Sequence, residues 1–178
     1  MSGRSAAAVL AGLVVAGVCA GCGSGDRPAE LAVDGVQPCE LIDAQTLSGL
    51  QVTAEPSPNP VVEGSGEEGS SCDYRPQYGG TVTVSVVTNN GIDRWTGSGE
   101  GKTKGIELPR VEGYRAIRLS GPSYEPGPHG MCTLYVDVAD GQSLRAEAGP
   151  TDADAPPSCD ISRRFAEAAV ASLAQRTG

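Results

Sequence analysis

The chain has 178 residues and a formal net charge of −9, with 13 Lys and Arg against 22 Asp and Glu. This excess of negative charge repels phosphate backbones, so nucleic acid is not expected as a partner. Aromatic residues make up only 4% of the chain, which requires a core of Val, Leu, Ile and Ala, and the length is that of one domain.

The amino-terminal segment MSGRSAAAVLAGLVVAGVCAGCGSG predicts a lipoprotein signal peptide over residues 1–21. Its apolar run is shorter than the roughly 20 residues that a membrane-spanning helix requires. The run ends in Cys19-Ala20-Gly21-Cys22, which resembles the bacterial lipobox, with Cys19 where that motif usually has an aliphatic residue. We therefore expect a cell-membrane protein anchored on the extracytoplasmic face by acylation of Cys22. Secretion after ordinary cleavage of the leader is the alternative.

Residues 22–37 show no sustained hydrophobic period and predict a flexible tether of roughly 20 Å. A single domain is expected over residues 38–178. It opens with a short helix for which Asp43 is the expected N-cap. Prolines and a Gly/Ser/Glu run between residues 55 and 71 then predict an exposed loop.

Alternating apolar residues predict about five strands. These strands are expected near Cys72, over residues 81–87, 114–119 and 132–138, and over residues 143–148. Asp140-Gly141 predicts the hairpin turn that joins the last two. A loop over residues 89–105, which carries Trp95, is expected between the second and third strands.

The final segment predicts an amphipathic helix with Ser158 as its N-cap. At 100° per residue, its apolar arc consists of Ile161, Phe165, Ala168, Ala169 and Leu173. The fold class expected from these elements is α+β. It combines a mostly antiparallel sheet of about five strands with a short amino-terminal helix and a longer carboxy-terminal one.

Four cysteines lie beyond the leader, at Cys39, Cys72, Cys132 and Cys159. An even number in an exported chain predicts two disulfides, for which three pairings are possible. We favour Cys39–Cys72 with Cys132–Cys159, because docking of the last helix on the sheet would bring Cys159 towards Cys132. The spacings contain no C-x-x-C and the chain has one histidine, so no zinc site is expected.

Two glycine-rich stretches match nucleotide-binding motifs in letters only. Residues 64–69 spell G-x-G-x-x-G, but a dinucleotide site needs a strand before the motif and a helix after it. Glu67 and Glu68 within the motif would also repel phosphate. Residues 96–103 approach a P-loop, with Thr96 in place of its first glycine. We therefore expect no nucleotide and no cofactor.

Catalytic and metal sites are not expected either. No serine stands in a G-x-S-x-G elbow, and His129 is the only imidazole available as a base. Carboxylate pairs are conceivable among Asp137, Asp140, Asp152 and Asp154, although the last two are too sparse for a calcium loop. The candidate ligand contacts are adaptable side chains in or near loops, namely Trp95, Tyr114, Tyr124 and His129.

From Pro38 to its end, the chain resembles a family of actinobacterial secreted lipoproteins that share a cysteine-bridged domain of unknown function. The resemblance rests on Pro38-Cys39-Glu40-Leu41, on Cys72-Asp73-Tyr74, on the strand from Cys132, and on Cys159 with the Ala/Leu-rich terminal helix. Tyr74 stands where the family usually has Trp in a Cys-x-Trp motif. The resemblance implies the same disulfide pairing as above and brings no catalytic residues.

The function expected from these features is a non-enzymatic binding or accessory module. Its partner would be an unknown envelope ligand or protein, and its anchor in the membrane would be the lipidated Cys22. The alternatives are an envelope hydrolase that uses paired carboxylates and a purely structural surface domain.

Overall fold

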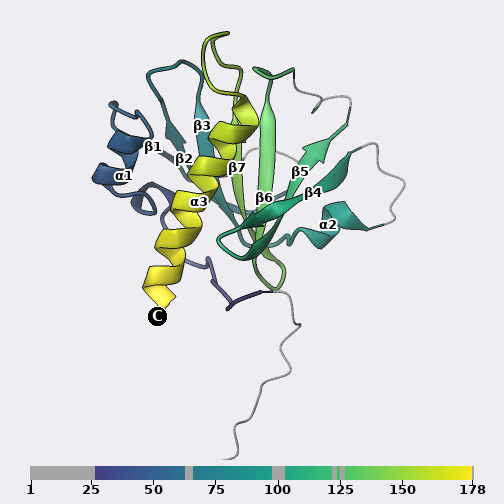
Figure 1. The fold of residues 1–178 in the computed structure, drawn as a ribbon. Coiled ribbons are helices and arrows are strands. Elements are labelled where there is room, and N and C mark those ends of the chain that lie inside the picture. The colour runs from purple at the N-terminus through teal and green to yellow at the C-terminus, as the bar shows by residue number, and fades with distance from the viewer. Residues whose placement is uncertain (1–26, 63–65, 98–102, 122–123, 125–126, 178) are drawn as a thin grey trace, which may run out of the picture.

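The computed structural model describes residues 27–62, 66–97, 103–121, 124 and 127–177 (Figure 1). The expected leader, Cys22 and the first residues of the expected tether lie outside this part of the chain. The elements follow in the order η1 (Pro38–Glu40), α1 (Ala44–Gly49), β1 (Ser57–Asn59), β2 (Gly69–Tyr74), β3 (Val82–Val87), α2 (Asp93–Thr96), β4 (Lys104–Val111), β5 (Tyr114–Ser120), β6 (Cys132–Ala139), β7 (Gln142–Ala148) and α3 (Ser158–Thr177).

The strands form one sheet in the order β1-β2-β3-β7-β6-β5-β4, and every neighbouring pair is antiparallel. The α+β class is confirmed, but the sheet has seven strands and not about five. The two additional strands are its edges: β1 lies in the expected loop, and β4 begins where a second loop was expected to end. Pro58 and Pro109 fit there because an edge strand has one unpaired side, where a missing N–H breaks no ladder.

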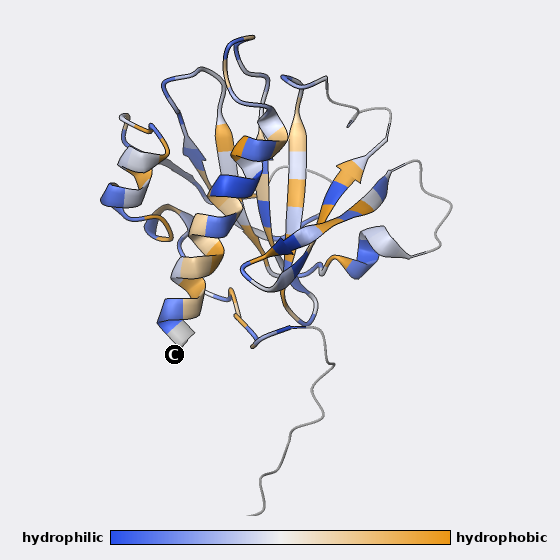
Figure 2. Ribbon diagram, viewed as in Figure 1, coloured by the Kyte–Doolittle hydropathy of each residue, from blue (hydrophilic) through white to orange (hydrophobic). Residues whose placement is uncertain are grey.

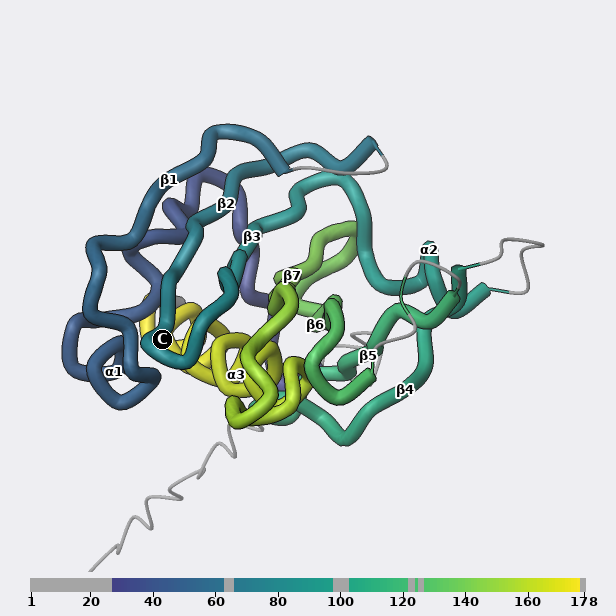
Figure 3. The backbone as a smooth tube through the Cα atoms, turned by 90° about the horizontal axis from the view of Figure 1, so that it is seen from above, coloured from purple at the N-terminus to yellow at the C-terminus, as the bar shows by residue number. Residues whose placement is uncertain are grey.

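Helix α3 covers one face of the sheet, as Figures 1 and 3 show. The strands alternate between hydrophobic and hydrophilic residues (Figure 2), so one of their faces is apolar. Four residues of the predicted helical arc are buried against it, namely Ile161, Phe165, Ala169 and Leu173. The strands contribute Val82, Val84 and Val86 of β3 and Cys132, Leu134, Val136 and Val138 of β6. The main core is therefore the predicted one.

The helix starts of α1 and α3 differ from each other. At α1, the carboxylate of Asp43 accepts a hydrogen bond from the Thr46 N–H at 2.9 Å, as predicted. At α3, Ser158 is the first helical residue and not the N-cap. Its buried hydroxyl has no hydrogen-bond partner among the residues that the structure describes. The predicted cap by Ser158 was therefore wrong, and the carbonyl oxygen of Pro157 accepts from the N–H of Asp160 at 2.9 Å.

Both favoured disulfides are present. Cys39–Cys72 ties η1 to β2, and Cys132–Cys159 ties β6 to the start of α3. The bridges span sequence separations of 33 and 27 residues. In the chain-entropy model, loops of this length stabilise the fold by about 3.5–4 kcal/mol each. This supports a core that contains few large aromatic side chains.

Residues 27–37, which were expected to belong to a flexible tether, pack on the domain. Leu31 and Val33 are 1% and 0% exposed. The Leu31 N–H donates to the Val138 carbonyl at 2.8 Å, and the Val33 N–H donates to Gln142 Oε1 at 3.0 Å. The folded domain therefore includes residues 27–37 and does not begin at Pro38. Within the described residues, no helix is both long and apolar enough to cross a membrane.

Candidate functional site

The sheet face opposite α3 is divided into an apolar half and a polar half. The apolar half lies over β5 and β6 and consists of Ile92, Ile117, Leu119 and Tyr135, with Trp95 and Tyr124 packed against them. Helix α2 brings Trp95 onto this cluster, and its ring centroid lies 5.9 Å from that of Tyr135. This half of the face is a small second core.

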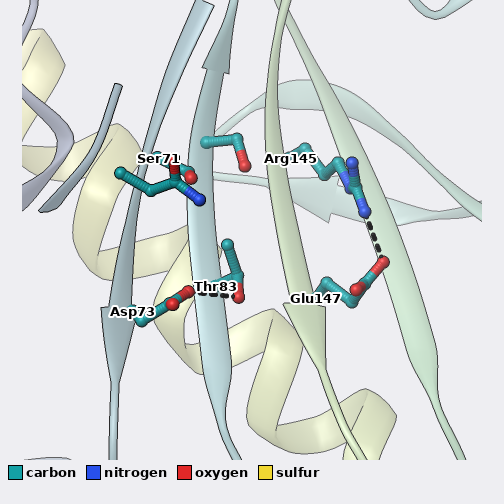
Figure 4. Close-up of a pocket in the computed structure, with 7 residues that line it drawn as sticks. Ser71, Asp73, Thr83, Arg145 and Glu147 are labelled. Carbon is teal, nitrogen blue, oxygen red and sulfur yellow. Dashed lines mark hydrogen bonds and ion pairs between the residues drawn. The ribbon is translucent and has the colours of Figure 1, made fainter. Parts of the chain in front are cut away.

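The polar half lies over β2, β3 and β7, where the side chains form two rows across the strands. Ser71, Ser85 and Arg145 are register partners in one row, and Asp73, Thr83 and Glu147 are partners in the next. Because alternate residues of a strand point to the same face, both rows project away from the core. These six residues and Asn59 line a cavity of about 120 Å³, which we call the polar groove (Figure 4).

Arg145 lies between two carboxylates at one side of the polar groove. Its guanidinium nitrogens lie 3.2 Å from Glu67 Oε2 and 2.6 Å from Glu147 Oε2. The Tyr135 hydroxyl donates to Glu67 Oε1 at 2.7 Å, and the Thr133 hydroxyl donates to Glu147 Oε2 at 2.7 Å. The side chain of Glu67 is fully buried. This network fixes the positions of all these side chains.

The protonation states of Tyr135 and Arg145 are secured by their surroundings. Burial raises the pKa of Tyr135 far above its ordinary value, and the nearby Glu67 charge raises it further. Burial disfavours the charged form of Arg145, but Tyr135, Glu147 and Glu67 together raise the pKa of Arg145 above its ordinary value. Tyr135 therefore remains a hydrogen-bond donor, and Arg145 remains a cation.

Glu67 reaches this network because its loop is held against the loop after β3. The Glu68 N–H donates to Asn89 Oδ1 at 2.9 Å, and Asn89 Nδ2 donates to the Gly66 carbonyl at 3.1 Å. Gly69 has a φ of +143°, and a Cβ atom there would lie 1.9 Å from the Val86 carbonyl oxygen. A side chain at Gly69 is therefore excluded. The G-x-G-x-x-G stretch ends at the start of a strand and not a helix.

Four polar atoms of the polar groove have no hydrogen-bond partner within the described part of the chain: the Ser85 hydroxyl, Asp73 Oδ2, Glu147 Oε1 and the Asn59 amide nitrogen. The other oxygen of Asp73 accepts from the Thr83 hydroxyl at 2.7 Å. Ser85 is only 1% exposed as a whole residue and lines the groove. The three oxygens offer acceptors to a ligand that carries N–H or O–H donors.

The four candidate ligand contacts do not line the polar groove. Trp95 and Tyr124 both pack against the second core, whereas Tyr114 is 3% exposed in the main core on the opposite face. His129 lies in the loop before β6, where its Nδ1 is 3.2 Å from the Thr151 hydroxyl. The structure thus brings only two of the four together.

The structure also shows where the four aspartates of the expected carboxylate pairs lie. Asp137 and Asp140 share the guanidinium of Arg27, and the side chain of Asp152 lies beside Gly79. Asp154 is exposed. Among the described residues, no group of three or more His, Cys, Asp or Glu could hold a metal ion. The carboxylates that do share a cavity are Asp73 and Glu147, a pair that sequence reasoning missed.

The sequence pattern indicates the polar residues of the groove but not that they lie together. Thr83 and Ser85 alternate with core valines in β3, and Arg145 and Glu147 alternate with Leu144, Ala146 and Ala148 in β7. This pattern shows that each strand has a polar face. It does not show that β3 and β7 are neighbours, because they are about 60 residues apart in the sequence.

Comparison with known proteins identifies one family. A family model described as "Protein of unknown function (DUF3558)" matches residues 16–172, which include every element up to most of α3. No curated protein and no solved structure matches the chain. Because the family model covers well over half of the chain, this protein belongs to the DUF3558 family of proteins of unknown function.

Proposed function

We propose that the protein is a lipid-anchored protein of the cell envelope that acts as a non-enzymatic binding module through the polar groove. The observation that carries the binding role is the hydroxyl of Ser85, a residue that lines the polar groove and whose hydroxyl has no hydrogen-bond partner among the described residues. A ligand in the groove would supply Ser85 with a hydrogen-bond partner.

The rigidity of the polar groove supports the same role. Arg145, Glu67, Glu147, Thr133 and Tyr135 are joined by ion pairs and hydrogen bonds of 2.6–3.2 Å. Side chains that are already fixed lose little conformational freedom when a ligand binds, which favours affinity. The groove is also small, at about 120 Å³, so it suits one functional group or a small ring of a ligand.

The lipid anchor is proposed from the lipobox-like residues that end in Cys22. The described domain begins at Arg27, five residues beyond Cys22. Five residues span at most about 18 Å when fully extended. An anchor at Cys22 would therefore hold the domain close to the bilayer surface.

Cell fractionation tests the anchor. The wild-type protein should sediment with membranes and be released by detergent, whereas Cys22→Ala should appear in the soluble extracytoplasmic fraction. Cys19→Ala is the matched control, because it leaves the acylated position intact and should remain in the membrane. Membrane retention of Cys22→Ala equal to wild type would contradict the anchor.

Thermal unfolding with envelope extracts tests the binding role. A ligand that binds only the folded state raises Tm, so extract fractions should raise the Tm of the wild type. Thr83→Tyr, which places a ring in the polar groove, should lose this increase, whereas Thr81→Tyr, at an exposed position before β3, should keep it. Equal increases in both variants, or none in the wild type, would contradict binding at the groove.

One alternative function has a specific observation in its favour. Asp73 and Glu147 line the same groove, and paired carboxylates are the catalytic groups of many glycoside hydrolases. Release of soluble fragments from the extract, abolished by Glu147→Gln, would favour an envelope hydrolase over a binding module.

A further inference from the structure

We infer that the ligand of the polar groove carries a primary ammonium group. This inference rests on the proposed binding function and names the chemistry of its ligand. It follows from the charges around the groove and from the positions of the acceptors that have no partner among the described residues.

The charges favour a cation. Two carboxylates, on Asp73 and Glu147, line the polar groove against one guanidinium, that of Arg145. Arg145 is already shared by Glu67 and Glu147, at 3.2 and 2.6 Å. A phosphate or carboxylate ligand would therefore be repelled by Asp73 and Glu147, and the charge of Arg145 that could attract it is already neutralised. A positively charged ligand would gain from the same field.

The positions of the acceptors fit the donors of an ammonium. Asp73 and Glu147 stand on either side of Thr83 in one row, so their backbones are about 9.5 Å apart, two strand spacings. Ser85 lies two residues farther along β3, about 7 Å from Thr83. The unpartnered oxygens of these residues are acceptors in the same groove, and an ammonium carries three N–H donors and no acceptor.

The position of Glu67 explains why Arg145 does not make the groove prefer an anion. Its buried carboxylate accepts from both Tyr135 and Arg145, which draws the guanidinium towards the second core. Asp73 Oδ2 and Glu147 Oε1, which accept no hydrogen bond from the described residues, are thereby left to the ligand. The loop that carries Glu67 thus sets the sign of the charge that the groove accepts.

Three linear probes of equal chain length test the inference: 1,5-diaminopentane, 1,5-pentanediol and glutarate. Binding to the purified protein is measured by isothermal calorimetry and by amide chemical shifts at low ionic strength. The diamine should bind at least about tenfold more tightly than the diol, and glutarate should not bind. The affinity of the diamine should fall as the salt concentration increases, because salt screens the attraction between the ammonium and the carboxylates.

Variants assign the binding to the groove. Asp73→Asn and Glu147→Gln should each weaken diamine binding about tenfold or more, as expected from loss of one hydrogen bond to a charged group. Asp154→Asn is the matched control, since it removes one exposed carboxylate outside the groove, and it should bind as wild type. Folding of each variant is verified by its Tm, so that weaker binding is not confused with unfolding.

Each outcome is decisive for the ammonium. Equal or tighter binding of the diol or of glutarate, no binding of the diamine, or an equal loss in Asp154→Asn would overturn it. Failure of the binding function itself gives a different result. In that case the envelope extract does not raise the Tm of the wild type, or it raises the Tm of Thr83→Tyr equally. A protein that passes this second test but prefers the diol binds an uncharged ligand in the groove.

Discussion

The carboxylate of Glu67 and the guanidinium of Arg145 form an ion pair of 3.2 Å in which the Glu67 side chain is fully buried and the Arg145 side chain is 13% exposed. The two residues are 78 positions apart in sequence, so the pair joins the loop before β2 to β7. Removal of one partner from a buried pair costs about 3–5 kcal/mol, because the remaining charge is left uncompensated.

We therefore expect Glu67→Ala to lower the free energy of unfolding by about 3 kcal/mol. The lower end of the range applies because Arg145 keeps Glu147, at 2.6 Å, while the Tyr135 hydroxyl loses its acceptor. Urea denaturation followed by circular dichroism measures the change. Glu68→Ala, at the exposed neighbouring position, should stay within about 0.5 kcal/mol of wild type. Similar losses in both variants would contradict a structural role specific to Glu67.

The packed segment at residues 27–37 gives a second prediction. Leu31 is 1% exposed and lies in the main core, so Leu31→Ala should lower the free energy of unfolding by about 2–5 kcal/mol. Val61→Ala, at a position that is 56% exposed, should have little effect. If Leu31→Ala left stability unchanged, this segment would contribute nothing to the fold and would behave as the tether that the sequence suggests.

The elements that sequence predicted well are those with a strong period. The helical arc from Ile161 to Leu173 and the alternation in β3 and β6 each repeat over several turns or residue pairs, and each faces the main core. Leu31 and Val33 provide only one such repeat, and the two edge strands contain prolines. Their conformations are set by contacts with distant strands, which no local pattern displays.

The polar groove could be predicted only in part for a similar reason. The polar faces of β3 and β7 are visible as alternation, but their neighbourhood comes from the sheet order. The burial of Glu67 depends on Asn89, which holds the loop through two hydrogen bonds, and on Gly69. In sequence, this stretch shows only acidic and small residues, which are typical of an exposed loop.

Asp137 predicts a dependence of stability on pH. Burial raises the pKa of Asp137, and the charge of Arg27 opposes the rise without cancelling it. A carboxyl with a raised pKa in the folded state stabilises the fold at low pH, and this stabilisation is lost as pH rises through the folded-state pKa. Above its ordinary value of 3.8, ionisation of Asp137 therefore disfavours the folded state.

We expect Asp137→Asn to gain stability relative to wild type as pH rises from about 3 to 7. Urea midpoints measured across this range for both proteins test the sign. Asp154→Asn serves as the control for loss of one negative charge and should run parallel to wild type. A difference between Asp137→Asn and wild type that narrows or reverses with rising pH would show that the ion pair with Arg27 outweighs burial.

The last prediction concerns Gly69, which connects the Glu67 loop to β2. At its φ of +143°, an alanine is strained by about 1–3 kcal/mol, and its Cβ would overlap the Val86 carbonyl oxygen at 1.9 Å. Relief of this overlap requires the loop to move away from β3, which would also withdraw Glu67 from Arg145. Gly69→Ala should therefore lower stability by more than the backbone strain alone and weaken diamine binding.

Gly141→Ala separates these two effects. Gly141 also has a positive φ, of +68°, but no atom lies within 4 Å of a Cβ built there. This variant should lose about 1 kcal/mol from the left-handed conformation, with unchanged diamine affinity, because the β6–β7 turn contributes no residue to the polar groove. Equal stability losses in the two variants, together with wild-type diamine affinity in Gly69→Ala, would show that the close approach of Gly69 to Val86 does not position Glu67.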